Sequence, residues 1–178
     1  MTPEIKPMTV DDYLNVVEYS DDPNYVPSDF ALHYLAFIKM VNGAEGEENK
    51  TPVIHLKMLD TLIKEQDTAN LLFRGAAKTT VFGEYMFPYL AVYGELPGLK
   101  VDVALYVTDS IENGVKNMRK NLEHRWENSA FLQEYIPSIR FTDIRWEFTN
   151  IDGHNLIVKG YGAITGVRGA KEKGKRPQ

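Results

Sequence analysis

The ten residues from Leu71 to Thr80 constrain this chain more than any other stretch of it. They read Leu-Leu-Phe-Arg-Gly-Ala-Ala-Lys-Thr-Thr, an apolar run followed by small residues and then by a helical pattern that opens with a lysine. We expect a strand from Asn70 to Phe73 that turns through the small residues into a helix starting at Lys78. Small residues let backbone N–H groups approach a phosphate chain, and a helix N-terminus favours negative charge. This layout is typical of a phosphate-binding P-loop.

The residue types in this loop suit a triphosphate and its metal ion. The Lys78 ammonium can reach the β and γ phosphates, and the Thr79 hydroxyl can be a ligand of Mg²⁺. The usual pattern G-x-x-x-x-G-K-[ST] is met imperfectly, because Leu72 and Ala77 stand where glycines are usual. The alternative is an ordinary strand-to-helix turn with a solvated lysine. The predicted nucleotide-binding residues in the loop are Arg74, Gly75, Ala76, Ala77, Lys78, Thr79 and Thr80.

Two neighbouring residues extend this hypothesis. Arg74 lies four residues before Lys78, so its guanidinium can stabilise charge that develops on the γ-phosphate. The competing interpretation of Arg74 is a salt bridge at the end of a strand. His55 falls on a predicted upstream helix and can place a polar group against a nucleotide base, although an ordinary surface histidine is the simpler interpretation.

Composition limits the class of protein. The formal net charge of −5 argues against a generally basic protein that coats nucleic acid. The absence of cysteine excludes a disulfide framework, a zinc–cysteine site and cysteine catalysis. The four histidines are widely spaced and show no metal-ligand spacing. Because the chain has no run as long and apolar as a membrane span, and no signal pattern at its start, we expect a soluble intracellular protein.

The positions of prolines, glycines and helix-capping residues predict two parts. These are a helical N-terminal extension over residues 1–50 and a P-loop domain over residues 51–178. In the extension, a helix is expected to start near Thr9, and a second is expected to be capped by Ser28 after two prolines. Residues 42–51 are rich in glycine and glutamate and are typical of a loop. A third helix is expected to begin at Pro52.

From residue 69 onward, strand and helix patterns alternate, which favours a parallel α/β core with its ligand at the carboxyl ends of the strands. Pro88 is expected to kink or end the helix that starts at Lys78. Residues 100–108 suit a buried strand, Asp109 or Ser110 can cap the next helix, and residues 144–158 suit a hairpin that turns at 150–153. The apolar stripe of that next helix comprises Ile111, Val115, Met118, Leu122 and Trp126. Its basic residues fit a solvated face better than a DNA site: Lys116, Arg119, Lys120 and Arg125.

The C-terminal region places an arginine in an irregular segment. Residues 160–169 contain too many glycines for a regular element, so Arg168 is expected in a flexible loop. The lysines and the arginine that follow are expected to be exposed.

Four segments together resemble the ATPase domain of the large terminase subunit, the DNA-packaging motor of tailed bacteriophages. Pro52, His55 and Met58 match the family's adenine motif, and Phe73 to Thr80 match its P-loop with the leading arginine. Residues 103–109 match the strand that follows the P-loop, and Ile164 to Gly169 match a Thr-Gly-x-x-Gly or Arg-Gly segment. The resemblance covers roughly residues 50–178.

This resemblance implies a P-loop NTPase fold of the RecA/ASCE type, in which a parallel sheet is flanked by helices. It implies an enzyme that binds ATP and Mg²⁺ and couples ATP hydrolysis to translocation of double-stranded DNA into a procapsid. Arg168 would act on the nucleotide of a neighbouring subunit in a homo-oligomeric ring. The implied partners are double-stranded DNA, the portal protein and the small terminase subunit. The implied location is the host cell cytoplasm, with transient docking on the procapsid and no membrane.

The chain departs from the family's pattern in three places. His55 replaces a glutamine, and Ala77 replaces a glycine. The sequence also stops at Gln178, where the family continues into an apolar strand that ends in Asp-Asp or Asp-Glu. The resemblance therefore predicts a truncated chain or one piece of a split gene, which lacks the family's nuclease domain and hydrolyses ATP weakly or not at all by itself. An alternative interpretation makes residues 103–109 the acidic strand, with Asp109 as its carboxylate.

Two other functions stay open. The first is a different P-loop ATPase, such as a helicase-like or phage replication protein, which would use Lys78 and Thr79 in the same way. The second is a non-catalytic P-loop module that mediates assembly only.

Overall fold

The structure is a computed structural model that describes residues 24–43, 51–64, 67–163, 174–175 and 177. The described residues form two compact units, one within residues 4–81 and the other within residues 82–178. The expected helix near Thr9, most of the expected loop over 42–51, and Arg168 with its glycine-rich segment lie outside the described residues.

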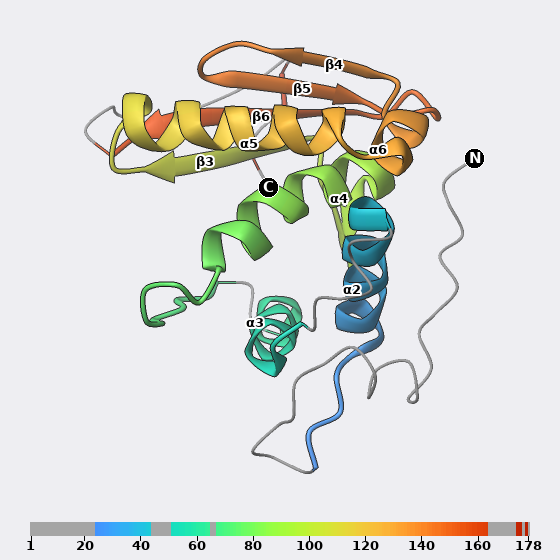
Figure 1. Ribbon diagram of the computed structural model, residues 1–178, viewed down its shortest axis with the longest axis vertical. Helices are drawn as coiled ribbons and strands as arrows, with labels where there is room; N and C mark the ends of the chain where they lie inside the picture. The colour runs from blue at the N-terminus through green and yellow to red at the C-terminus, as the bar shows by residue number, and fades with distance from the viewer. Residues whose placement is uncertain (1–23, 44–50, 65–66, 164–173, 176, 178) are drawn as a thin grey trace. The chain divides into compact units, whose positions relative to one another are not determined.

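The unit of residues 4–81 is built on two helices, α2 (Asp29–Asn42) and α3 (Val53–Lys64). Ser28 is the N-cap of α2, as predicted, and its hydroxyl accepts a hydrogen bond from the Ala31 N–H at 3.1 Å. The α2 helix ends at Gly43, whose φ of 58° is a conformation that glycine adopts readily. In Figure 1, α3 is seen nearly end-on beside α2.

A buried carboxylate joins these two helices. Asp60 of α3 is only 5% exposed, and it accepts hydrogen bonds from the hydroxyls of Ser28 (2.5 Å) and Tyr25 (2.6 Å). A buried carboxylate is costly unless its oxygens are hydrogen-bonded, and these donors meet that need. The N-terminus of α2 is thereby fixed to the middle of α3.

The helix that follows the predicted loop begins at Lys78, and its hydrogen-bond pattern changes along its length. It contains the π-helical segment η2 (Thr80–Tyr85) and continues as α4 (Met86–Tyr93). Pro88 does not end this helix, contrary to one of the two predicted outcomes. It lies in the first turn of α4, directly after a segment with a wider hydrogen-bond pattern, where its missing N–H is tolerated.

The unit of residues 82–178 contains a four-stranded sheet in the order β3-β6-β5-β4. Its strands are β3 (Val103–Thr108), β4 (Ser138–Phe141), β5 (Arg145–Thr149) and β6 (Asn155–Gly162). The strands β3 and β6 pair in parallel, whereas β5 pairs antiparallel with both β6 and β4. The molecule is therefore an α/β protein, as predicted, but its sheet is mixed. Short hairpin connections impose the antiparallel pairs, since a parallel pair needs a long crossover.

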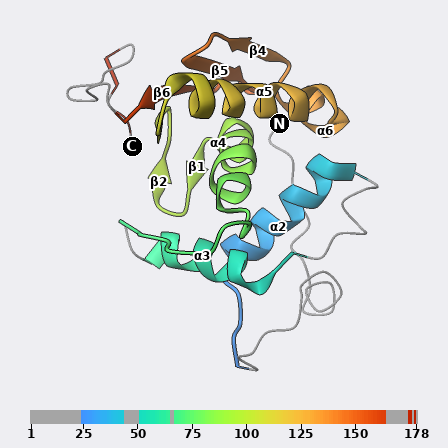
Figure 2. The ribbon, with the colours of Figure 1, turned by 60° about the vertical axis from the view of Figure 1, so that its left-hand side comes forward.

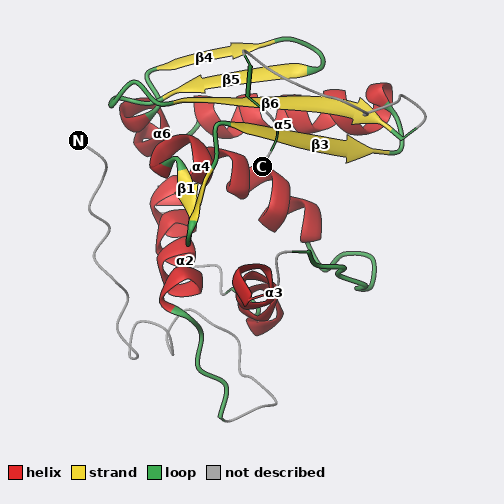
Figure 3. Ribbon diagram, turned by 180° about the vertical axis from the view of Figure 1, so that it is seen from behind, coloured by secondary structure: helices red, strands yellow, loops and turns green. Residues whose placement is uncertain are grey.

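Helices cover one face of this sheet. The helical crossover from β3 comprises η3 (Ile111–Val115), α5 (Lys116–Glu127) and α6 (Ala130–Tyr135). Figure 1 shows α5 in front of the strands, and from behind, in Figure 3, the strands lie in front of α5. Ser110 caps η3, and the predicted stripe holds at its centre, because Val115, Met118 and Leu122 are buried.

The core of this unit lies between the sheet and these helices. Trp146 of β5 is fully buried, and its ring packs edge-on against Phe87 of α4, with 6.0 Å between the ring centroids. On the same face, Gly160 allows a close approach, because an added Cβ would lie 2.1 Å from Cγ1 of Val115. A separate hairpin of β1 (Glu95–Leu96) and β2 (Leu99–Lys100) turns at residues 97 and 98 (Figure 2).

Most basic residues of the crossover helix form ion pairs. Lys116 pairs with Glu112 at 2.8 Å, Arg119 pairs with Glu123 at 3.0 Å, and Arg125 pairs with Glu84 at 2.8 Å. Arg125 also lies over the ring of Tyr85, 4.0 Å from its centroid. These pairs agree with the predicted solvated face. Among the described residues, no helix is long and apolar enough to span a membrane.

Candidate functional site: the loop between Phe73 and Thr80

The loop turns twice before the helix begins. The Ala76 N–H donates a hydrogen bond to the Phe73 carbonyl at 3.4 Å, and Gly75 between them has a φ of 95°, as the third position of a type II turn requires. Ala77 then has a φ of 50°, and it is the only non-glycine residue with positive φ among the described residues. The helix starts at the next residue, and its first backbone bond runs from the Val81 N–H to the Ala77 carbonyl at 3.0 Å.

The strand predicted over residues 70–73 is absent from the structure. Residues 70–73 have no strand partner and no regular secondary structure, and Leu71 and Phe73 are 95% and 71% exposed. An apolar run becomes a strand only when a neighbouring strand supplies its hydrogen bonds. The layout of small residues that lead into a helix at Lys78 is confirmed, but the element before them is an exposed extended segment.

Lys78 folds back over the loop. Its ammonium donates hydrogen bonds to the carbonyls of Leu72 (3.2 Å) and Phe73 (3.4 Å). Both carbonyls belong to the residues that lead into the turn, so the Lys78 side chain crosses from the helix start to the opposite end of the loop. Its positive charge therefore lies along the loop.

His55 contacts the loop from α3. Its Nε2 atom lies 2.9 Å from the carbonyl oxygen of Ala76. Ala76 is a buried residue. The structure therefore brings His55 together with residues 73–80, and the contact it makes is with the loop backbone. The predicted contact of His55 with a nucleotide base stays a prediction. Arg74, Gly75, Ala77 and Thr79 are exposed, and Thr80 is half-buried.

Sequence reasoning missed two residues that support this loop. Tyr34 of α2 is fully buried, and its hydroxyl donates a hydrogen bond to the Val81 carbonyl at 2.6 Å. Asp60 holds α3 in place through Ser28 and Tyr25. A buried acid on an amphipathic helix is a signal for such a role, but its partners lie more than 30 residues away in the sequence.

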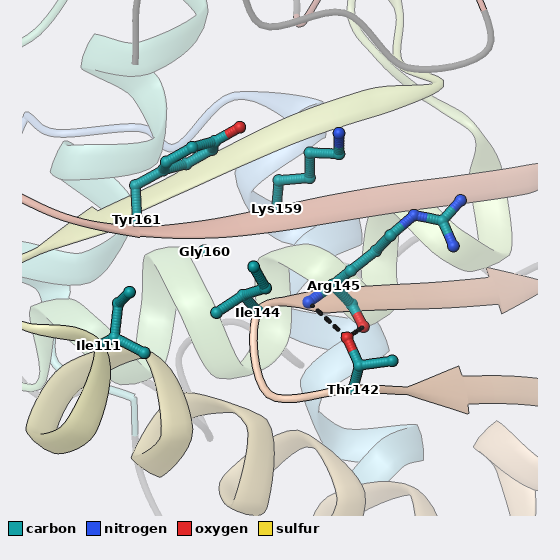
Figure 4. A pocket seen from close by; sticks show the side chains of 7 residues that line it. All are labelled: Ile111, Thr142, Ile144, Arg145, Lys159, Gly160 and Tyr161. Carbon is teal, nitrogen blue, oxygen red and sulfur yellow. Dashed lines mark hydrogen bonds between the residues drawn. The ribbon is translucent and has the colours of Figure 1, made fainter. Parts of the chain in front are cut away.

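Outside the loop, one cavity of about 410 Å³ lies in the sheet unit. Its walls come from the β4–β5 turn, β6 and the start of η3, and the residues that line it include Ile111, Ile144, Arg145, Lys159 and Tyr161 (Figure 4). Arg145 forms an ion pair with Glu147 of its own strand, so its charge is balanced. Because the walls are mostly apolar and the arginine is already paired, the cavity does not indicate a particular ligand or reaction.

A second polar cluster lies at the start of β3. Asp102 accepts from Lys175 at 2.7 Å and lies 3.4 Å from Nε2 of His154. The hydrogen bond from Lys175 holds the pKa of the Asp102 carboxyl below its usual value. In the part of the chain that the structure describes, no group of three or more acidic or histidine side chains is arranged to hold a metal ion.

The chain significantly matches no protein-family model, no curated protein and no solved structure.

Proposed function

We propose that residues 73–80 bind the triphosphate of Mg·ATP. The observation that carries this proposal is the pair of left-handed residues, Gly75 and Ala77, directly before the helix start at Lys78. Backbone N–H groups in turns with left-handed residues can form an anion-binding nest, and the N–H groups of Gly75 and Ala77 flank the Ala76 N–H, which donates to the Phe73 carbonyl. The positive end of the helix adds to the same field.

The side chains around this nest fit a triphosphate with its metal ion. The exposed Thr79 hydroxyl follows the lysine, where the P-loop pattern supplies a Mg²⁺ ligand. The Lys78 ammonium holds only two neutral carbonyls in its present position, and a phosphate oxygen is a stronger, charge-assisted acceptor. The salt-bridge interpretation of Arg74 assumed a strand that ends beside it, and that strand is absent. Arg74 is exposed, and we propose that it contacts the γ-phosphate.

Beyond nucleotide binding, we propose that the chain is the ATPase portion of a viral DNA-packaging motor. The four matching segments support this assignment, and the α/β architecture with a helix directly after the loop is compatible with it. Double-stranded DNA, the portal protein and the small terminase subunit are the proposed partners. ATP hydrolysis by this chain alone is expected to be weak, and Arg168 is the proposed residue that acts across subunits.

Calorimetric titration of the chain with Mg·ATP tests the proposed binding site. Lys78→Ala should lower ATP affinity at least tenfold, since a charge-assisted contact contributes about 1.5–3 kcal/mol and tenfold corresponds to about 1.4 kcal/mol. Lys64→Ala is the matched control, because Lys64 is an exposed lysine at the end of α3 in the same unit. Equal ATP affinity in wild type and Lys78→Ala would refute the proposal.

Stimulation of hydrolysis separates the two enzymatic alternatives. A packaging motor should respond to double-stranded DNA with procapsids, and a helicase-like ATPase should respond to single-stranded nucleic acid. The absence of ATP binding would favour a non-catalytic assembly module.

A further inference from the structure

The contact between His55 and Ala76 fixes the proton on the histidine ring. A carbonyl oxygen can only accept a hydrogen bond, so Nε2 of His55 must carry the hydrogen that lies between these atoms at 2.9 Å. The imidazole therefore donates to the loop in both its neutral and its protonated forms. Its role at this position is that of a hydrogen-bond donor to backbone.

The same contact sets the direction of the next backbone N–H. In a trans peptide, the C=O and N–H groups point to opposite sides of the chain, and the described residues contain no cis peptide. Because the Ala76 carbonyl is directed at α3, the Ala77 N–H is directed away from α3. The left-handed conformation of Ala77 then leads the chain into the helix at Lys78.

Hydrogen bonds hold both the helix that carries the donor and the helix that follows the loop. The α3 helix is fixed by Asp60, whose carboxylate accepts from the hydroxyls of Ser28 and Tyr25. The helix after the loop is held by Tyr34, whose hydroxyl donates to the Val81 carbonyl. The loop backbone is thus hydrogen-bonded to α3 at Ala76, and the helix that follows the loop is hydrogen-bonded to α2 at Val81.

We propose that His55 is a positioning residue for phosphate binding, which orients the Ala77 N–H toward the phosphates by holding the Ala76 carbonyl. This inference rests on the proposed binding of Mg·ATP at the loop. It assigns His55 to the backbone of the loop in place of the base edge. Loss of His55 therefore weakens every ligand that carries the phosphate chain, whatever base is attached.

The test measures the affinity of the full chain for Mg·ATP, Mg·GTP and magnesium tripolyphosphate. His55→Phe keeps a planar ring and removes the donor, so affinity for all three ligands should fall about two- to tenfold, the effect expected of one lost hydrogen bond. His55→Gln places an amide N–H near the same carbonyl and should recover most of that affinity. Thr61→Val is the control, because it removes a side-chain hydrogen bond within α3, to the Lys57 carbonyl, that does not reach the loop.

Three results would overturn the inference. A loss confined to Mg·ATP, with tripolyphosphate unaffected, would assign His55 to the base. Unchanged affinities in His55→Phe would remove any role, and an equal loss in His55→Gln would show that the donor does not matter.

Lys78→Ala separates failure of the positioning role of His55 from failure of the proposed binding site. If Lys78→Ala lowers affinity and His55→Phe does not, only the positioning role of His55 is refuted. If the wild-type chain binds none of the three ligands, both the binding site and the positioning role are refuted.

Discussion

At the scale of single residues, Ala77 is the most unusual position in the described chain. A residue with a Cβ in the left-handed region costs roughly 1–2 kcal/mol relative to the right-handed one. Ala77 has a φ of 50°, at the position where P-loops usually carry glycine. The loop therefore holds strain that glycine would not have.

Ala77→Gly should raise the stability of the protein by up to about 1.6 kcal/mol. The relief of strain, roughly 1–2 kcal/mol, exceeds the roughly 0.4–1 kcal/mol that glycine costs through the freedom of the unfolded chain. Ala76→Gly is the matched control. Ala76 has no positive φ and is buried, so its replacement should destabilise by about 1–2 kcal/mol through lost methyl burial and added chain freedom. Urea unfolding midpoints check both values, and a fall in both variants would contradict the strain at Ala77.

Residue-level features that depend on near neighbours were predictable from the sequence. The caps at Ser28 and Ser110 follow from local chemistry, since each side chain accepts from an N–H three residues later. The contact of His55 with the Ala76 carbonyl was not predictable, because 21 residues separate the two and no local pattern encodes the pairing. The left-handed conformation of Ala77 could be suspected only from the glycine that usually occupies its position.

At the scale of elements, periodicity predicted most helices and the β5–β6 hairpin, but not how the strands pair. The turn at residues 150–153 forms as predicted, because its asparagine and glycine favour that geometry locally. No strand forms over residues 70–73, because a strand needs a partner to supply its hydrogen bonds. The sequence analysis missed β4 because its alternating pattern is only four residues long. The order of the strands in the mixed sheet was not predictable, because periodicity within a strand does not show which other strand it pairs with.

The contact of β6 with η3 gives a prediction at this scale. Gly160→Ala should destabilise by about 1–3 kcal/mol, because its Cβ would overlap the stiff, buried side chain of Val115. Val115→Ala alone should cost about 2 kcal/mol through the cavity it leaves. The double variant should be more stable than the sum of the two losses predicts, by about 1 kcal/mol or more, since each change makes room for the other. Denaturant unfolding of all four proteins measures this coupling, and simple additivity would rule out the close contact.

At the scale of the whole molecule, the two units carry different spectroscopic reporters. Both tryptophans, Trp126 and Trp146, belong to the unit of residues 82–178, whereas the proposed nucleotide loop belongs to the unit of residues 4–81. Tryptophan fluorescence therefore follows the sheet unit alone, and the helical signal in circular dichroism follows both units.

If the loop binds Mg·ATP, the ligand should stabilise the two units unequally. At a hundred times the dissociation constant, binding contributes about 2.7 kcal/mol to the unit that holds the site. Thermal unfolding with and without Mg·ATP should show a larger shift in the circular dichroism midpoint than in the fluorescence midpoint. The Lys78→Ala protein is the control: with affinity lowered at least tenfold, its circular dichroism midpoint should shift by about half as much as that of the wild type, or less, at the same ligand concentration. Equal shifts of the two midpoints in the wild type would mean that the units unfold as one.

The π-helical segment from Thr80 to Tyr85 lies where the chain passes from one unit to the other, at residues 81 and 82. A π-helix accommodates one more residue per hydrogen-bonded ring than an α-helix. Its conversion to α-helix would turn the residues on one side by roughly 100° about the helix axis relative to those on the other, because an α-helix completes a turn in 3.6 residues. The boundary between the two units therefore falls within a helical segment whose hydrogen-bond register differs by one residue from that of the α-helix on its C-terminal side.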